Sequence, residues 1–216
     1  MEYLDLNVWK RREHFAMFQG MDSPHFSLTA PVDVTEVLRR CKQSGRSFYH
    51  TMVYLAARTA NAIPEFRYRI RGAQVVAHDR VHPSFTYLTR DEVFGFCNVD
   101  YTPELDRFTQ AVAAELERLG ETVNLSDAPG RDDLLFITCL PWVAFTQIMH
   151  PLHRPADSVP RLAWGKYSLE NGRYRLPFSV QAHHALLDGL HVGRYYQTLQ
   201  GLLDEPEWLT VPAADE

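Results

Sequence analysis

The sequence contains few cysteines and no long apolar run. Cys41, Cys97 and Cys139 are odd in number and widely spaced, so they predict reduced thiols rather than a disulfide framework. No stretch of about 18 apolar residues is present, which argues against a membrane-spanning helix. The first residues also lack the basic region and apolar core of a secretory signal. We therefore expect a cytoplasmic protein.

An excess of positive charge is also absent. The formal net charge is −5 at pH 7, which argues against general nucleic-acid binding because that needs a basic face. Hydrophobic residues make up 45% of the 216 residues, an ordinary share for a globular protein with one substantial core. No internal repeat, low-complexity segment or linker is evident. The sequence predicts one domain over residues 1–216, and an enzyme is the default class.

Hydrophobic periodicity and turn residues predict alternating strands and helices. Strands are expected at 26–30, 68–70, 74–77, 84–89, 93–99, 134–140, 162–169 and 174–180. Helices are expected from an N-cap at Asn7, from a capping-box-like pair at Asp33 and Glu36 to Lys42, and at 48–62, 102–119 and 190–203. The Asn171-Gly172 pair predicts a hairpin turn between the strands at 162–169 and 174–180. Residues 121–133 are expected to form a loop, and the tail from Glu205 to be frayed. These elements predict an α/β fold, a two-layer sandwich with a mixed, mostly antiparallel sheet and helices on one face.

The most informative stretch is Val180–Gly189, which contains two adjacent histidines between an apolar strand and a helical pattern. Histidine can take a proton and return it near neutral pH. A purely structural interpretation is a buried histidine pair with Asp188 capping the helix. A metal site of His184, Asp188 and His191 is a weaker alternative, since no further Cys/His cluster supplies a full ligand set.

The order His184-x-x-x-Asp188-Gly189 resembles the active-site motif of the chloramphenicol acetyltransferase family of CoA-dependent acyltransferases. Three further segments resemble signatures of that family: residues 6–15, 81–86 and 141–147. The resemblance covers roughly residues 3–204. It implies a cytoplasmic homotrimer with active sites at subunit interfaces. It also implies acetyl transfer from acetyl-CoA to a hydroxyl of chloramphenicol, which inactivates the antibiotic, with no metal and no permanently bound cofactor.

The resemblance assigns roles to individual residues. His184 would be the general base, and His183 would be structural, buried behind it. Asp188 would brace the loop through an ion pair with Arg11, because a guanidinium suits such a bidentate pair. Tyr49 would lie near the pantetheine arm of CoA. Tyr167 would lie by its adenine.

Several positions depart from the family pattern. Gln147 stands where the family has a serine that stabilises the oxyanion, and its amide can still donate a hydrogen bond. Ala163 replaces a threonine that helps to hold a water. In the acceptor pocket, Phe18 replaces a tyrosine and Pro24 a small polar or cysteine residue, whereas Phe26 retains the aromatic.

These departures leave two alternatives beside a chloramphenicol acetyltransferase. One is an acyltransferase of the same fold that acts on a different hydroxyl or amine acceptor. The other is a catalytically weak ligand-binding homologue, for which Gln147 and Ala163 are the only support in the sequence. Turnover of acetyl-CoA with another acceptor would favour the first alternative, and turnover that depends on His184 would exclude the second.

Overall fold

The computed structural model of the chain describes residues 1–126, 130–152, 156–206 and 209. The expected loop at 121–133 therefore lies partly outside the described residues, as does most of the expected frayed tail. The helices are α1 (Arg12–Phe18), α2 (Thr35–Ser44), α3 (Phe48–Asn61), the 3-10 helix η1 (Pro64–Arg67), α4 (Leu105–Leu119) and α5 (Gly189–Asp204). The strands are β1 (Glu2–Tyr3), β2 (His25–Asp33), β3 (Tyr68–Arg71), β4 (Gln74–Ala77), β5 (His82–Leu88), β6 (Phe94–Asn98), β7 (Leu134–Leu140), β8 (Arg161–Gly165), β9 (Ser168–Glu170) and β10 (Arg173–His183).

The main sheet has the strand order β2-β10-β8-β7-β5-β6, and β9 pairs with β10. The pairs β5–β7 and β7–β8 are parallel, whereas every other pair in this sheet is antiparallel. The apolar run Leu134–Leu140 is central, as its continuous hydrophobicity predicts. The mixed, mostly antiparallel sheet of the predicted α/β fold is confirmed.

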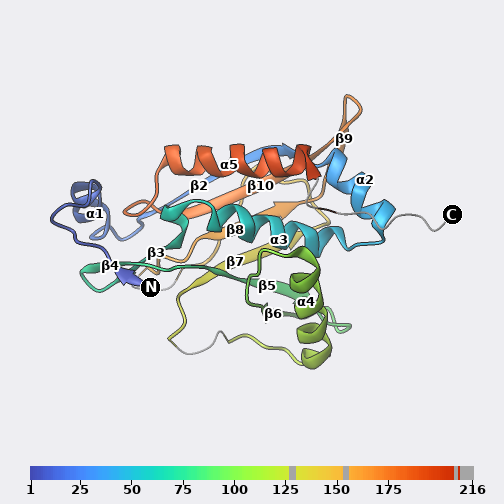
Figure 1. Ribbon diagram of the computed structural model, residues 1–216, viewed down its shortest axis with the longest axis horizontal. Coiled ribbons are helices and arrows are strands. Elements are labelled where there is room, and N and C mark those ends of the chain that lie inside the picture. Colours follow the sequence, from blue (N-terminus) through green and yellow to red (C-terminus); the bar gives the residue numbers. More distant parts are fainter. Residues whose placement is uncertain (127–129, 153–155, 207–208, 210–216) are drawn as a thin grey trace.

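Helices α2, α3 and α5 pack together over the sheet, and α4 lies against β6 and α3 (Figure 1). Their apolar faces and the strands enclose the core, with Met52, Leu55, Trp164 and Phe178 almost completely buried. Helix α1 projects at the end of the molecule where α5 begins (Figure 1). This arrangement places the N-terminal segment beside the loop that follows β10.

The irregular segment after β7 contacts polar side chains on strands β2 and β10. Ser27 Oγ donates to the carbonyl of Ile148 at 3.0 Å, and the His150 amide donates to Gln181 Oε1 at 2.8 Å. Ser27 and Gln181 are register partners, so their side chains share one sheet face. The same segment also contacts the residues after β8, because the Lys166 amide donates to the Val143 carbonyl at 2.8 Å.

Three predicted helix starts are wrong. Asn7 is not an N-cap: its backbone and side-chain amides both donate to Asp5 Oδ1, which forms a local turn, and α1 begins only at Arg12. The predicted capping box of α2 is incomplete: Asp33 Oδ1 accepts from the Thr35 amide at 3.0 Å, but Glu36 pairs with Arg39 and Arg40 instead of reaching back, and the helix runs on to Ser44.

Helix α4 begins at Leu105 rather than at Thr102-Pro103. The Pro103 carbonyl accepts a hydrogen bond of 2.5 Å from the Tyr54 hydroxyl on α3, which holds that residue outside the helix. The predicted strand at 162–169 is also interrupted, since β8 ends at Gly165 and β9 starts at Ser168. In contrast, the Asn171-Gly172 turn is confirmed, with φ angles of 51° and 78°.

Two further findings concern the chain as a whole. Strand β1 pairs with β4 and forms a separate three-stranded sheet with β3, which the sequence pattern did not reveal. No helix in the described part of the chain is long and apolar enough to cross a membrane.

Candidate active site

The loop 184–188 connects the central strand β10 to α5. The His184 amide donates to the carbonyl of Pro24 at 2.8 Å, which fixes the start of the loop to the segment before β2. The Leu186 and Leu187 amides both donate to the carbonyl of His183, at 3.0 and 3.1 Å. Ala185, Leu186 and Leu187 are completely buried. Core packing therefore anchors the loop, while His184 remains half-buried.

Two aromatic rings hold the imidazole of His184. Phe18 stacks on it at 4.2 Å between centroids, and Phe26 packs at 4.6 Å with a tilt of 42°. Together with the Pro24 carbonyl, the three predicted acceptor-pocket residues thus surround His184. Phe18 comes from α1 and Phe26 from β2, so the fold brings together segments that are separate in the sequence.

One hydrogen bond sets the tautomer of His184. Its Nδ1 lies 3.0 Å from the carbonyl oxygen of Leu187. A carbonyl only accepts, so Nδ1 carries the proton in the neutral ring, and Nε2 keeps a free lone pair. Nε2 can therefore accept a proton from a bound molecule.

His183 is a different kind of histidine. It is 2% exposed, and its Nδ1 accepts from the Ala185 amide at 3.2 Å. Its ring meets that of His25 edge to face at 5.0 Å. Burial, reinforced by the nearby His25, lowers the pKa of His183 to about 4. The ring is thus neutral near pH 7, in agreement with the expected structural role.

The predicted ion pair between Arg11 and Asp188 is present. Arg11 Nη1 bonds to Asp188 Oδ2, and Arg11 Nη2 donates to the carbonyl of His184 at 3.3 Å. Burial alone would raise the pKa of Asp188, but the hydrogen bond from Arg11 and the charges of His191 and Arg11 hold it below its usual value. One guanidinium therefore ties α1 to both ends of the loop.

Asp188 also caps α5, as the structural interpretation predicted. Its Oδ1 accepts from the Leu190 amide at 3.0 Å, and His191 completes a capping box with it. The three residues of the metal alternative do not converge. His184 Nδ1 faces Leu187, whereas His191 faces Asp188 and Glu65, and no group of three or more His, Cys, Asp or Glu among the described residues is arranged to hold a metal ion.

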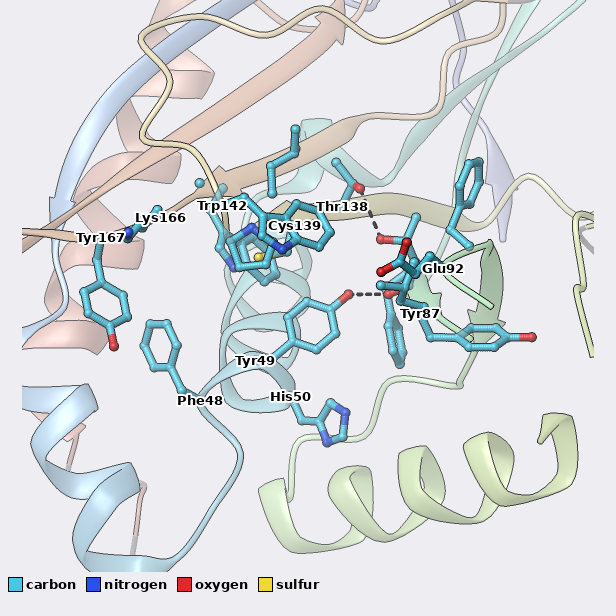
Figure 2. Close-up of a pocket in the computed structure, with 18 of the residues that line it drawn as sticks. Phe48, Tyr49, His50, Tyr87, Glu92, Thr138, Cys139, Trp142, Lys166 and Tyr167 are labelled. Carbon is cyan, nitrogen blue, oxygen red and sulfur yellow. Dashed lines mark hydrogen bonds between the residues drawn. The ribbon is translucent and has the colours of Figure 1, made fainter. Parts of the chain in front are cut away.

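A second feature is a cavity of about 930 Å³ between the start of α3 and the ends of β5, β7 and β8 (Figure 2). Most of its lining is aromatic or aliphatic, including Phe48, Phe85, Phe94, Leu116, Trp142 and Trp164. Tyr49 and Tyr167, the two predicted CoA-binding residues, both line it. The cavity is large and apolar enough for a flexible organic ligand.

The polar side chains of the cavity differ in how free they are to bind a ligand. The Tyr49 hydroxyl donates to the Thr86 carbonyl at 2.6 Å, and burial raises the pKa of Tyr49. Thr86 and Thr138 bond each other at 3.1 Å. Tyr167, by contrast, is 41% exposed and meets Phe48 edge to face at 5.9 Å. Tyr167 therefore lies at the rim, where a polar part of a ligand would remain in contact with water.

His184 is not among the described residues that line this cavity. The cavity is formed by the first turn of α3, whereas His191, three residues after the loop 184–188, contacts Glu65, just beyond the last turn of that helix. Helix α3 has 14 residues, so these two ends are separated by about 20 Å along it. Within one chain, the cavity and the histidine are separate.

Gln147 is exposed, and no hydrogen bond joins its side chain to any other described residue. It lies in the irregular segment after β7 and is brought neither to the cavity lining nor to His184 within this chain. Ala163 is fully buried on β8 between Thr138 and Ser179. Its methyl offers no hydrogen bond there.

Sequence reasoning missed several groups. The Leu187 carbonyl that orients His184 is a backbone atom, so no residue type signals it. His191 was considered only as a metal ligand, although it stands three residues after the N-cap Asp188, at the position of the partner residue in a capping box. Glu65, which faces His191, has no signal because the contact is made only in the folded chain.

Comparisons with known proteins identify the family of this chain. The family model described as Chloramphenicol acetyltransferase matches residues 1–200. Chloramphenicol acetyltransferase 2 of Escherichia coli is 34% identical over 206 residues, which cover 93% of this chain and 96% of the relative. Chloramphenicol acetyltransferase 3 of Escherichia coli is 33% identical over 201 residues, covering 92% and 94%.

Solved structures show the same fold. A chloramphenicol acetyltransferase structure superposes with a TM-score of 0.84 at 26% identity, covering 94% of this chain and 99% of that chain. The dihydrolipoamide acetyltransferase of Azotobacter vinelandii shares the fold with a TM-score of 0.67 at 18% identity, covering 86% and 84%. This chain belongs to the chloramphenicol acetyltransferase family.

Proposed function

We propose that this protein transfers the acetyl group of acetyl-CoA to a hydroxyl of chloramphenicol, with His184 as the general base. The observation that carries the proposal is the imidazole of His184. It is clamped between Phe18 and Phe26, and its Nδ1 is held by the Leu187 carbonyl. A base with a fixed tautomer and a free Nε2 suits the removal of a proton from a hydroxyl. Family membership supplies the acyl donor and the acceptor.

The proposed reaction is a direct transfer. Nε2 of His184 takes the hydroxyl proton as the acceptor oxygen attacks the thioester carbonyl. The tetrahedral oxyanion then collapses, the carbon–sulfur bond breaks, and the proton passes to the departing CoA sulfur. No acyl-enzyme is needed, because both substrates are held together in one site.

The acyl donor would occupy the large apolar cavity. Tyr49 would lie beside the pantetheine arm, and Tyr167, at the rim, beside the adenine. Acetyl-CoA enters as a co-substrate, and no permanently bound cofactor is part of the proposal. Phe18, Pro24 and Phe26 would line the acceptor end, since they surround His184.

The Gln147 side-chain amide is proposed to donate to the oxyanion from a neighbouring chain. Its exposure and its lack of a partner among the described residues leave it free for this role. A preorganised donor of this kind is worth about 10²–10³ in rate.

We further propose a cytoplasmic homotrimer with active sites at the subunit interfaces and one acyltransferase domain per chain over residues 1–216. The separation of His184 from the cavity supports shared sites, because a neighbouring chain would have to supply the missing half. Exposed apolar side chains on α1, on β2 and in the segment after β7 fit a subunit interface. They include Met17, Leu28, Trp142, Val143 and Met149.

The experiment is thiol release from acetyl-CoA with and without chloramphenicol, for the wild type and for His184→Ala and His184→Gln. We expect release that depends on chloramphenicol in the wild type and a loss of at least about 10²-fold in both variants, since each lacks the base. Glu117→Ala, at an exposed position on α4, is the control and should keep wild-type turnover. Wild-type turnover in the His184 variants would contradict the proposal.

A further inference from the structure

His191 lies on the far side of Asp188 from Arg11. Its Nδ1 is 2.8 Å from Asp188 Oδ1 and 3.1 Å from the Asp188 backbone nitrogen. The ring is 6% exposed. In a capping box the residue three positions after the N-cap is usually Glu or Gln. Here an imidazole has that place, and its second nitrogen, Nε2, points away from Asp188.

That second nitrogen reaches another element. Nε2 of His191 lies 3.4 Å from Glu65 Oε1 in η1, the short helix that follows α3. The hydrogen bond from His191 outweighs burial and keeps the pKa of Glu65 below its usual value. Glu65 Oε2 is buried and has no hydrogen-bond partner among the described residues. A buried carboxylate oxygen without a partner is costly, so the contact of Glu65 with His191 needs an explanation.

The chain of contacts ends at the base. Asp188 directly follows Leu187, whose carbonyl orients the His184 ring. On one side, Arg11 holds the Asp188 carboxylate and the His184 carbonyl. On the other side, the Asp188 amide donates to Nδ1 of His191. A shift of Asp188 would therefore move the acceptor that fixes the tautomer of His184.

We propose that His191 and Glu65 are positioning residues, which form a second brace of the loop 184–188 and hold the Leu187 carbonyl against His184 Nδ1. The inference rests on the proposed role of His184 as the base. It adds a connection from the end of α3 to the catalytic loop, separate from the Arg11 brace.

The test compares His191→Ala, His191→Gln, Glu65→Ala and Glu65→Gln. We expect His191→Ala to lower kcat about 10- to 100-fold, because a misplaced base is costly even without loss of a contact to substrate. KM for acetyl-CoA should be unchanged, since His191 does not line the cavity among the described residues. His191→Gln should recover most of the kcat, because glutamine is an ordinary capping-box residue. Glu65→Gln should retain more activity than Glu65→Ala.

Two controls separate positioning from stability. Leu203→Val removes a buried methylene from the far end of α5 and should lower Tm without lowering kcat of the folded fraction. Glu117→Ala, at an exposed position on α4, should leave both unchanged.

A spectroscopic measurement needs no substrate. Nitrogen-15 NMR of the imidazoles should show His184 protonated at Nδ1 in the wild type, with the other tautomer increasing in His191→Ala. The proposal is overturned if that tautomer ratio is unchanged, or if activity falls only in proportion to Tm as in Leu203→Val. If the wild type does not acetylate chloramphenicol, the proposed function fails, yet the tautomer ratio still decides whether the brace exists.

Discussion

At the scale of single residues, the two adjacent histidines have opposite properties because of their surroundings. His183 is buried against His25 and has a pKa lowered to about 4. His184 is half-buried, and its Nδ1 hydrogen bond leaves Nε2 free. The same side chain thus supports the core at one position and can serve as a base at the next, because consecutive residues of a strand end face opposite sides.

Gln147 gives a test of the oxyanion donor at this scale. We expect Gln147→Ala to lower kcat by about 10²–10³-fold, because it removes the donor, while KM for acetyl-CoA stays close to wild type. Gln147→Ser should retain activity, because a hydroxyl can also donate. The neighbouring Thr146→Ala is the matched control, and equal rates in all of these proteins would show that the oxyanion is stabilised elsewhere. Steady-state kinetics with acetyl-CoA measure these values.

At the scale of elements, three buried or half-buried histidines lie where the segment after β7 packs against β2 and β10. His25 on β2, His183 on β10 and His150 in that segment each have a pKa lowered to about 4, chiefly by burial. Arg161 lowers the pKa of His25 and His150 further, whereas the Asp157 carboxylate opposes the shift at His25 and His183. These elements are therefore packed around neutral imidazoles.

A pH dependence of stability follows. Below pH 6.5 the unfolded chain binds protons on these histidines, while the folded chain does not until about pH 4. The free energy of unfolding should therefore be highest above pH 6.5 and decrease as the pH falls toward 4. Urea unfolding across this range measures the effect. His150→Gln should flatten the dependence, whereas the same slope in that variant would count against this explanation.

Gly165 and Gly193 form a matched pair of tests. A Cβ on Gly165 would lie 2.5 Å from the Val143 carbonyl oxygen, at the junction of β8 with the cavity. Gly165→Ala should therefore cost about 1–3 kcal/mol of stability and raise KM for acetyl-CoA. A Cβ on Gly193 in α5 would meet nothing within 4 Å. Gly193→Ala should stabilise the protein by about 0.4–1 kcal/mol, as measured by thermal unfolding. A reversed order of the two Tm values would refute the packing argument.

At the scale of the whole molecule, one chain holds the two halves of the proposed site apart. His191, just after the His184 loop, contacts Glu65 beyond the end of α3, and the cavity lies at the beginning of that helix. Symmetric assembly would bring the base of one chain to the cavity of the next, since a head-to-tail interface repeats around a closed ring. The geometry thus favours sites built from two chains.

Complementation tests this arrangement. We expect His184→Ala and the cavity-blocking Thr138→Phe each to be inactive alone, while mixed trimers refolded from equal amounts recover about a quarter of the wild-type activity, because each site needs one intact half from either chain. Sedimentation should show three chains per particle in every sample. No recovery in mixed trimers of normal mass would mean that each site lies within one chain.

The sequence alone determined most of the elements and, by resemblance, the candidate site residues. Periodicity predicted the helix at 48–62, observed at 48–61, and the central strand 134–140, and turn residues predicted the hairpin at Asn171-Gly172, because these depend on local patterns. The helix starts at Asn7 and Thr102 were wrong, since Asp5 and Tyr54 compete for the neighbouring backbone. Local preference gives way where a tertiary hydrogen bond is available.

Only the tertiary structure decided how the site is put together. The sequence indicated the histidine at 184 and, by resemblance, its Arg11–Asp188 brace, and the structure placed them together. It could not indicate that a backbone carbonyl sets the tautomer, that Glu65 faces His191, or that the cavity lies away from the base. These relations join residues distant along the chain through packing, and no spacing in the sequence encodes them.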